Sequence, residues 1–190
     1  PHHHPHPACP PARPPPAASP APAGSGEPAT LALVPAEVLI TPGAEVRFRA
    51  RAFDALGRPL GAVTPASVSL EKLAGTLTPE GVPSSAETTF RAASTSFQAG
   101  FVVAKLGELT AKARVRVLSP LPWREDFTSL PVGQPVPYWV FGGRFKVAEL
   151  DGEKMLNKYP APTGLQRTRT YIGPASSSDY TIVADLMSKR

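Results

Sequence analysis

The sequence predicts an all-β protein, and three observations carry that prediction. Residues 45–53 alternate apolar side chains with arginines, which is the period of a strand with one buried and one solvated face. Between residues 30 and 118, turn residues separate short strand-like runs and no long helical period occurs. A further alternating stretch is divided by Asp151-Gly152, a strong hairpin signal. Together these patterns favour stacked β-sheets.

The longest predicted strand is Glu45–Phe53. Arg47, Arg49 and Arg51 lie on its solvated face, and it ends in the turn Asp54–Pro59, whose residues accept reversed backbone geometry. The other strands predicted in this region are Thr30–Val34, Glu37–Thr41, Ala66–Glu71, Glu87–Ala92, Phe97–Ala104 and Leu109–Leu118, with a turn-rich connection at Gly75–Val82 and a hairpin turn at Lys105–Glu108.

Several motifs within residues 30–118 resemble those of bacterial Ig-like repeats. Pro42-Gly43 precedes a strand, Phe53-Asp-x-x-Gly57 ends it, and Ala99-Gly-Phe-Val-Val-Ala104 is followed by Ala113-Arg-Val-Arg-Val117. The motif Val34-Pro-x-x-Val38 precedes these motifs and is part of the same resemblance. The resemblance implies an Ig-like β-sandwich over residues 30–118. Such modules act as spacers, adhesins and binders alike, so the resemblance indicates the fold more specifically than the function.

Residues 119–190 follow a second order of motifs after Ser119-Pro-Leu-Pro122, which marks a boundary. Trp123-Arg-Glu-Asp-Phe127, Trp139 to Val147, Asp151-Gly152 and the apolar strand Asp179–Met187 are similar to the start of concanavalin A-like (laminin G-like) jelly rolls. The full module of that family is longer, so the resemblance implies an incomplete, truncated jelly roll. Half a sandwich exposes an edge and an apolar face, so we do not expect this part to fold alone.

Residues 1–29 are predicted to be a disordered linker rich in Pro, His and Ala. Proline is the outlier of the composition at 25 residues, and a proline-rich chain favours an extended backbone that buries little area. The chain begins without an initiator Met in the middle of this composition. We therefore interpret the sequence as a fragment of a longer protein, in which a missing export signal carries no information.

The net charge of +5 does not indicate nucleic-acid binding. Basic and acidic residues are interspersed, no run of Lys or Arg occurs, and the arginines of Arg47–Arg51 fall on a solvated strand face. No stretch approaches the roughly 20 apolar residues of a membrane span. Cys9 is the single cysteine, which excludes a disulfide within the chain.

The three parts in series resemble the C-terminal portion of bacterial PQQ-binding-like β-propeller repeat proteins. The resemblance implies an exported protein of the periplasm or cell envelope, with a PQQ-like cofactor in a propeller outside this chain. No blade repeat of about 40 residues is visible, so no residue of this sequence is assigned to such a cofactor.

Candidate metal ligands are few. His2, His3, His4 and His6 could bind a transition metal, but an extended tail fixes no geometry, and we expect no cofactor in this segment. Asp151 and Asp185 are weak candidates for calcium, together with Glu153 and Asp179, because calcium takes six to eight oxygen ligands. Asp151 is more economically explained as the turn residue before Gly152.

Aromatic side chains are the candidate ligand-binding residues. Trp123, Tyr138 and Tyr171 could stack on sugar rings, whereas Trp139 is expected in the core. Glu125 and Asp126 are adjacent, so a regular strand would point them to opposite faces, which is unsuited to a paired acid and base. All four histidines lie in the tail, which leaves no Ser-His-Asp set for catalysis.

We therefore expect a non-catalytic accessory segment that spaces its parent protein and docks a polysaccharide or an envelope protein. The alternative is a jelly-roll glycoside hydrolase, similar to the 3-keto-disaccharide hydrolases, whose catalytic residues would follow Arg190. A purely structural cell-surface stalk is a third possibility.

Overall fold

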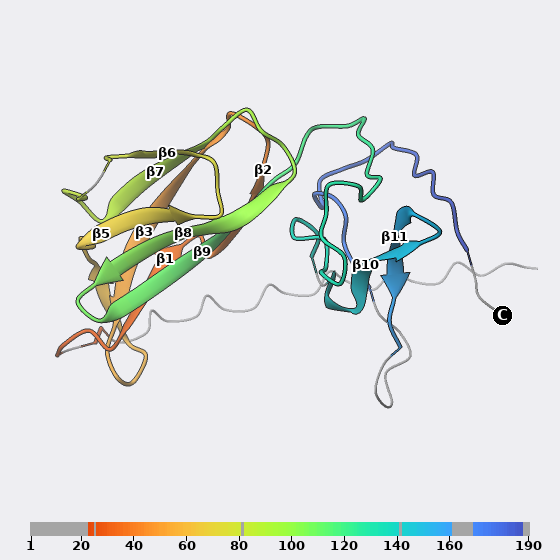
Figure 1. The fold of residues 1–190 in the computed structure, drawn as a ribbon. Coiled ribbons are helices and arrows are strands. Elements are labelled where there is room, and N and C mark those ends of the chain that lie inside the picture. Colours follow the sequence, from red (N-terminus) through yellow and green to blue (C-terminus); the bar gives the residue numbers. More distant parts are fainter. Residues whose placement is uncertain (1–22, 25, 81, 141, 161–168, 188–190) are drawn as a thin grey trace, which may run out of the picture.

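The computed structural model describes residues 23–24, 26–80, 82–140, 142–160 and 169–187. These residues form a two-sheet β-sandwich that continues into a smaller region carrying one β-hairpin (Figure 1). The predicted all-β class is confirmed, since one short 3₁₀ turn, Gly142–Arg144, is the helical element of the described chain. No helix among these residues is long and apolar enough to cross a membrane.

The first sheet contains five strands. It is antiparallel in the order β1 (Thr30–Val34), β3 (Glu45–Phe53), β7 (Glu87–Ala92) and β6 (Gly75–Thr78), and β4 (Pro59–Ala62) pairs with the last residues of β3. The exposed arginines of β3 form ion pairs here, because Arg47 and Arg49 both reach Glu87 on β7. Their predicted solvated position is confirmed.

The second sheet contains four strands, in the order β2 (Glu37–Ile40), β9 (Leu109–Val117), β8 (Gln98–Leu106) and β5 (Ser67–Glu71). β2 runs parallel to β9, and the other pairs are antiparallel. Only Pro35 and Ala36 separate β1 from β2, so one extended stretch contributes a strand to each sheet. That stretch ties the two sheets together at their edges.

The sandwich core is made by the inward face of each alternating strand. Phe48, Phe90, Val102 and Val115 are fully buried between the sheets. Gly100 on β8 lies against the end of β5, where a Cβ atom would collide with the backbone carbonyl groups of Glu71 and Lys72. The alternating pattern that predicts each strand therefore also predicts which of its faces is buried in the core.

Asp54 fixes the turn between β3 and β4. Its side chain is buried, its Oδ1 accepts the backbone N–H groups of Leu56 and Arg58 at 2.9 Å each, and Arg58 Nε donates to Oδ2 at 2.8 Å. Burial by itself would raise the pKa of Asp54, but these hydrogen bonds outweigh it and lower the pKa. Gly24, within the predicted linker, donates to the Pro59 carbonyl at 2.9 Å, so the chain is already in contact with the sandwich there.

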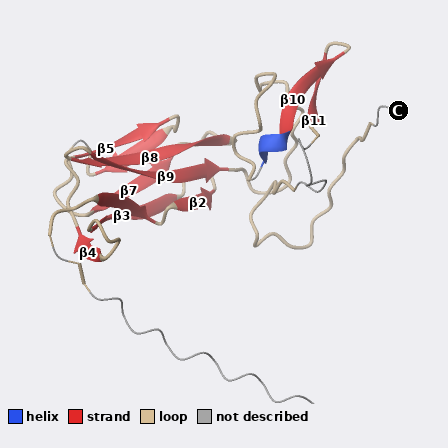
Figure 2. Ribbon diagram, turned by 90° about the horizontal axis from the view of Figure 1, so that it is seen from below, coloured by secondary structure: helices blue, strands red, loops and turns tan. Residues whose placement is uncertain are grey.

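The region after the sandwich contains a hairpin of β10 (Phe145–Leu150) and β11 (Glu153–Lys158). Asp151 and Gly152 have φ angles of 54° and 82°, so both turn residues have the positive φ of a two-residue hairpin loop. Figure 2 shows the hairpin projecting from the loops that surround it. A single backbone bridge joins Val140 to Tyr171.

Three sequence predictions are corrected by the strand assignments. Gly75–Thr78, expected in a turn-rich connection, forms the edge strand β6, and Pro59–Ala62, expected at the end of a turn, forms β4. The apolar stretch Asp179–Met187, expected as a strand, has no strand partner in the described chain. Strand formation requires a neighbouring backbone as well as an alternating sequence, and the described residues supply none for this segment.

Candidate binding surface

The junction between the sandwich and the following region has its own hydrophobic core. Leu118, Leu130, Val136, Tyr138 and Val147 are buried in it. Residues from both sides of the boundary pack against this cluster: Leu39, Phe97 and Ala99 from the sandwich, and Phe127, Trp139 and Leu156 from the region after it. The two parts therefore share apolar surface as well as the covalent connection through Ser119–Pro122.

Phe97 is the aromatic centre of this junction core. Its ring lies 5.5 Å from that of Trp123 in an edge-to-face arrangement and 5.4 Å from that of Tyr138. Both distances fall in the range in which aromatic pairs attract beyond the area they bury. Close by, Ser96 Oγ lies 2.6 Å from Ser119 Oγ, a hydrogen bond across the boundary. Trp123 and Tyr138, two of the predicted sugar-binding residues, are therefore brought together as packing partners of Phe97.

Tyr138 does not present its ring to a ligand in this structure, because only 3% of it is exposed. Its hydroxyl donates a hydrogen bond to Glu125, whose other carboxylate oxygen accepts the backbone N–H of Phe127 at 2.7 Å. Asp126 accepts from the backbone and hydroxyl of Thr128 at 3.0 and 2.6 Å. These two carboxylates have separate structural partners, and Glu125 is only partly exposed rather than a freely solvated charge.

Burial, and then the hydrogen bond and charge of Glu125, raise the pKa of the Tyr138 phenol well above its usual value of about 10. Because the phenol has a higher pKa in the folded than in the unfolded state, its protonated form stabilises the fold. This stabilisation is complete below about pH 10 and is lost as the pH rises further.

We therefore expect Tyr138→Phe to lower the free energy of unfolding by about 1–3 kcal/mol at pH 8, because the Glu125 carboxylate loses the hydrogen bond from the phenol. The difference from the unmodified chain should shrink above pH 10. Urea titrations of both proteins between pH 8 and pH 11 measure this difference. Two parallel stability curves over that range would show that the phenol has no special environment.

Arg116 is a buried cation at the same junction. The alternation of β9 places it on the outer face of its sheet, yet its exposed fraction is 7%. Its register neighbours, Leu39 on β2 and Ala99 on β8, both pack against the junction core. Its Nη1 forms an ion pair with Glu37 on β2, and its Nε has no hydrogen-bond partner among the described residues. Burial lowers the pKa of Arg116. Nothing in the sequence pattern distinguishes it from Arg114, which is only half-buried.

Tyr171 is the remaining predicted ligand-binding residue, and about half of it is exposed. Its backbone is fixed by reciprocal hydrogen bonds of 3.0 Å with Val140, and the hydroxyl of Thr170 donates to the Val140 carbonyl at 3.1 Å. Tyr159, at the end of β11, is also well exposed, and Lys146 Nζ lies 5.8 Å from the centre of its ring. Sequence reasoning did not select Tyr159, which follows directly on β11.

The structure does not assemble the predicted calcium ligands. Asp151 lies in the β10–β11 turn, whereas Asp185 lies in the segment after Tyr171, and no three His, Cys, Asp or Glu side chains of the described residues converge on a point. His2, His3, His4 and His6, proposed as metal ligands, lie outside the described residues.

A shallow open groove lies beside the edge strand β6. It is lined by Pro42, Gly43, Gly75, Thr76, Arg91, Ala92, Ala93 and Ser94. Arg91, its single ionisable lining residue, already pairs with Glu45 at 3.3 Å. None of the candidate ligand-binding or calcium-binding residues, Trp123, Tyr138, Tyr171, Asp151 and Asp185, lines this groove.

Comparison with known proteins gives little further guidance. No family model matches the chain, and no curated protein matches it. Among solved structures, domains 4 and 5 of the S-layer protein SbsC are similar with a TM-score of 0.36 and 18% identity, covering 49% of this chain and 53% of that one. Domains 1–6 of the surface layer protein SbsC give a TM-score of 0.36 at 15% identity, covering 70% of this chain and 22% of that one. Likeness at this level carries no argument about function.

Proposed function

We propose that this chain is a spacing and docking segment, in which the sandwich holds the following region in a fixed orientation. The observation that supports this is the shared junction core. Leu39 and Phe97 of the sandwich pack against the cluster containing Val136 and Val147. Arg116, the register neighbour of Leu39, is buried as well. A flexible tether would leave these side chains solvated, whereas a buried contact couples the orientation of its two sides.

We also propose that residues 30–118 form an Ig-like module. The strand order β1-β3-β7-β6 in one sheet and β9-β8-β5 in the other is that of the A-B-E-D and G-F-C sheets of an Ig constant-type sandwich. β2, at the edge of the second sheet, and β4 are additions to that plan. Modules of this architecture serve many functions, so this proposal bears on the role as a spacer and does not identify a ligand.

The docking role is assigned to the region after the sandwich. Tyr171 supports it, since its backbone is anchored to Val140 while half of the residue is exposed. A half-exposed tyrosine on a fixed backbone is suited to stacking against a sugar ring at low entropic cost. A polysaccharide of the cell envelope is the partner class that we propose.

We expect Tyr171→Ala to weaken binding to insoluble polysaccharide about tenfold, because one ring stacking interaction is lost. Co-sedimentation with cellulose, xylan and peptidoglycan measures this. The backbone bridge to Val140 is retained by Ala, and Tyr171→Phe is the matched control that keeps the ring. Equal binding by Tyr171→Ala and the unmodified chain would show that Tyr171 is not part of the binding surface. If the unmodified chain bound none of the three polysaccharides, the proposed partner class would be contradicted.

We further propose that the parent protein is exported to the bacterial periplasm or envelope, and that it is a PQQ-like propeller protein. Both rest on the sequence resemblance of the linker, the Ig-like motifs and the jelly-roll motifs. The parent's coding sequence upstream of Pro1 tests them: propeller blade repeats and an export signal are expected there, and a cytosolic enzyme domain would contradict both.

A further inference from the structure

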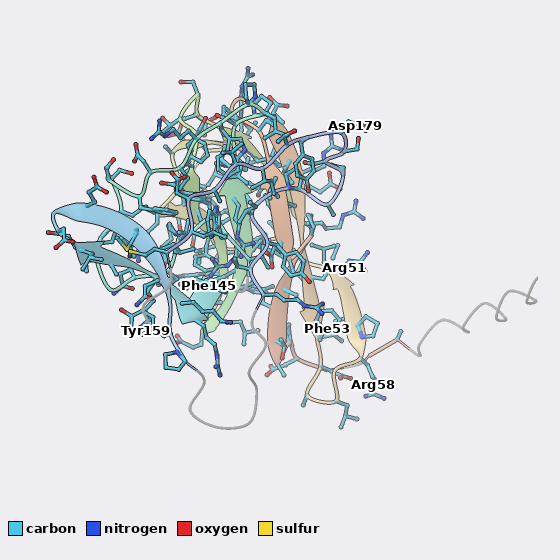
Figure 3. All side chains as sticks on the ribbon, turned by 90° about the vertical axis from the view of Figure 1, so that its right-hand side faces the viewer. Arg51, Phe53, Arg58, Phe145, Tyr159 and Asp179 are labelled. Carbon is cyan, nitrogen blue, oxygen red and sulfur yellow. The ribbon has the colours of Figure 1, made fainter. Side chains whose placement is uncertain are left out.

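The base of the hairpin, which is the end away from the β10–β11 turn, carries a well-exposed tyrosine. Tyr159 follows directly on β11, and its backbone N–H donates to the Arg144 carbonyl at 2.8 Å. This bond adds one residue pair to the ladder beyond Phe145 and Lys158. Tyr159 is 41% exposed, and Figure 3 shows it at the same end of the hairpin as Phe145. It therefore combines a paired backbone with substantial exposure.

Two polar side chains share the hairpin face of Tyr159. Because side chains alternate along a strand, Asn157 lies on the same side of β11 as Tyr159, and its register partner Lys146 lies on that side of β10. The ammonium of Lys146 lies 5.8 Å from the centre of the Tyr159 ring. The opposite face of the hairpin carries Val147, which is buried in the junction core. The amide and the ammonium therefore accompany Tyr159 on the face directed away from that core.

The cations at the base of the hairpin have no carboxylate partner. The ion pairs formed among the described residues all lie within the sandwich. Arg144, Lys146 and Lys158 form none with the described residues, which include every Asp and Glu of the chain. The acidic residues of the hairpin lie at its turn end: Glu149, Asp151 and Glu153. The surface around Tyr159 is therefore positively charged and locally uncompensated.

We propose that Tyr159, Asn157 and Lys146 form a binding site for a saccharide that carries a carboxylate, such as a uronate residue of an acidic polysaccharide. The tyrosine supplies a surface against which a sugar ring stacks. The amide of Asn157 donates to and accepts from sugar hydroxyls, and the ammonium of Lys146 pairs with the carboxylate. This inference rests on the proposed docking function and specifies the class of its ligand.

Charge and size favour this ligand over a neutral sugar and over a protein. A neutral sugar would use the ring and the amide, but it would leave the charges of Lys146, Arg144 and Lys158 without a counter-charge. A carboxylate on the sugar supplies one. A stable protein interface takes roughly 20–30 residues from each side, whereas this polar set occupies one face of a two-stranded hairpin. The surface therefore matches a sugar unit in extent and an acidic one in charge.

The test is isothermal titration calorimetry of the full chain with oligogalacturonate and with its methyl ester, which keeps the sugar rings and removes their charge. We expect the free acid to bind about tenfold more tightly than the ester at low salt, and salt to reduce this preference by screening. Lys146→Gln should remove most of the preference, because the ammonium that pairs with the carboxylate is lost. Tyr159→Ala should weaken the binding of both ligands about tenfold, because the stacking surface is lost.

Lys105→Gln is the matched charge control, since Lys105 is exposed on β8 of the sandwich, and Tyr159→Phe keeps the ring. Both should bind like the unmodified chain. Equal affinity for the acid and the ester would overturn the proposal, as would equal losses in Lys105→Gln and Lys146→Gln or unchanged binding by Tyr159→Ala. Binding to cellulose or xylan without binding to oligogalacturonate would overturn the acidic-sugar site and leave the docking function standing. Binding to none of these ligands would contradict both.

Discussion

Phe90→Ala is expected to cost about 3–5 kcal/mol of the free energy of unfolding, the largest effect of any single truncation that we predict. Phe90 on β7 is fully buried, and its ring lies beneath Gly75 of β6, where a Cβ atom would collide with it. β7 is also the strand that joins β6 to the rest of the first sheet. Removing the ring therefore leaves a cavity and loosens an edge strand.

Urea unfolding followed by tryptophan fluorescence and by circular dichroism measures this loss. Phe101→Ala is the matched control, because Phe101 lies on the outer face of the second sheet, with Lys112 Nζ 5.4 Å and the Arg114 guanidinium carbon 4.7 Å from its ring centre. That variant should lose only about 1 kcal/mol. Equal losses for the two variants would contradict the assignment of Phe90 to the core and Phe101 to the surface.

Phe97→Ala is expected to weaken the junction by about 2–4 kcal/mol, because it removes two aromatic contacts and part of the shared core. The loss should be local. Amide hydrogen exchange in residues 119–160 should accelerate, whereas the amides of β3 and β7 should keep most of their protection.

Phe101→Ala serves again as the control, since Phe101 is not part of the junction core. It should leave exchange in residues 119–160 unchanged. Unaltered exchange there in Phe97→Ala would show that the contact between the two parts contributes nothing to the stability of the second.

Most of the sandwich could be predicted from the sequence, because its strands alternate cleanly and end at strong turn residues. The bounds predicted for β1, β3 and β7 agree with the structure residue for residue. β6 was missed because Gly75, Pro79 and Gly81 around it are turn formers, and a short edge strand adds little alternation.

The junction was beyond the reach of sequence patterns. Alternation on β9 assigns Arg116 to an outer face, but it cannot show that Arg116 is buried there or that its register neighbours Leu39 and Ala99 pack against the junction core. Tyr138 was predicted as a ligand platform for the same reason, since nothing near it in sequence reveals Phe97 as its neighbour. In Asp179–Met187 the sequence pattern predicts a strand with an apolar face, but it does not determine which other strand would pair with it.

The central claim is that the sandwich and the region after it tumble as one body. ¹⁵N relaxation of the full chain measures this directly. The structure predicts one rotational correlation time for the amides of residues 30–118 and of residues 123–158. Two distinct correlation times, with the shorter one in residues 123–158, would show that the junction core does not hold the two parts together and would contradict the proposed role as a rigid spacer.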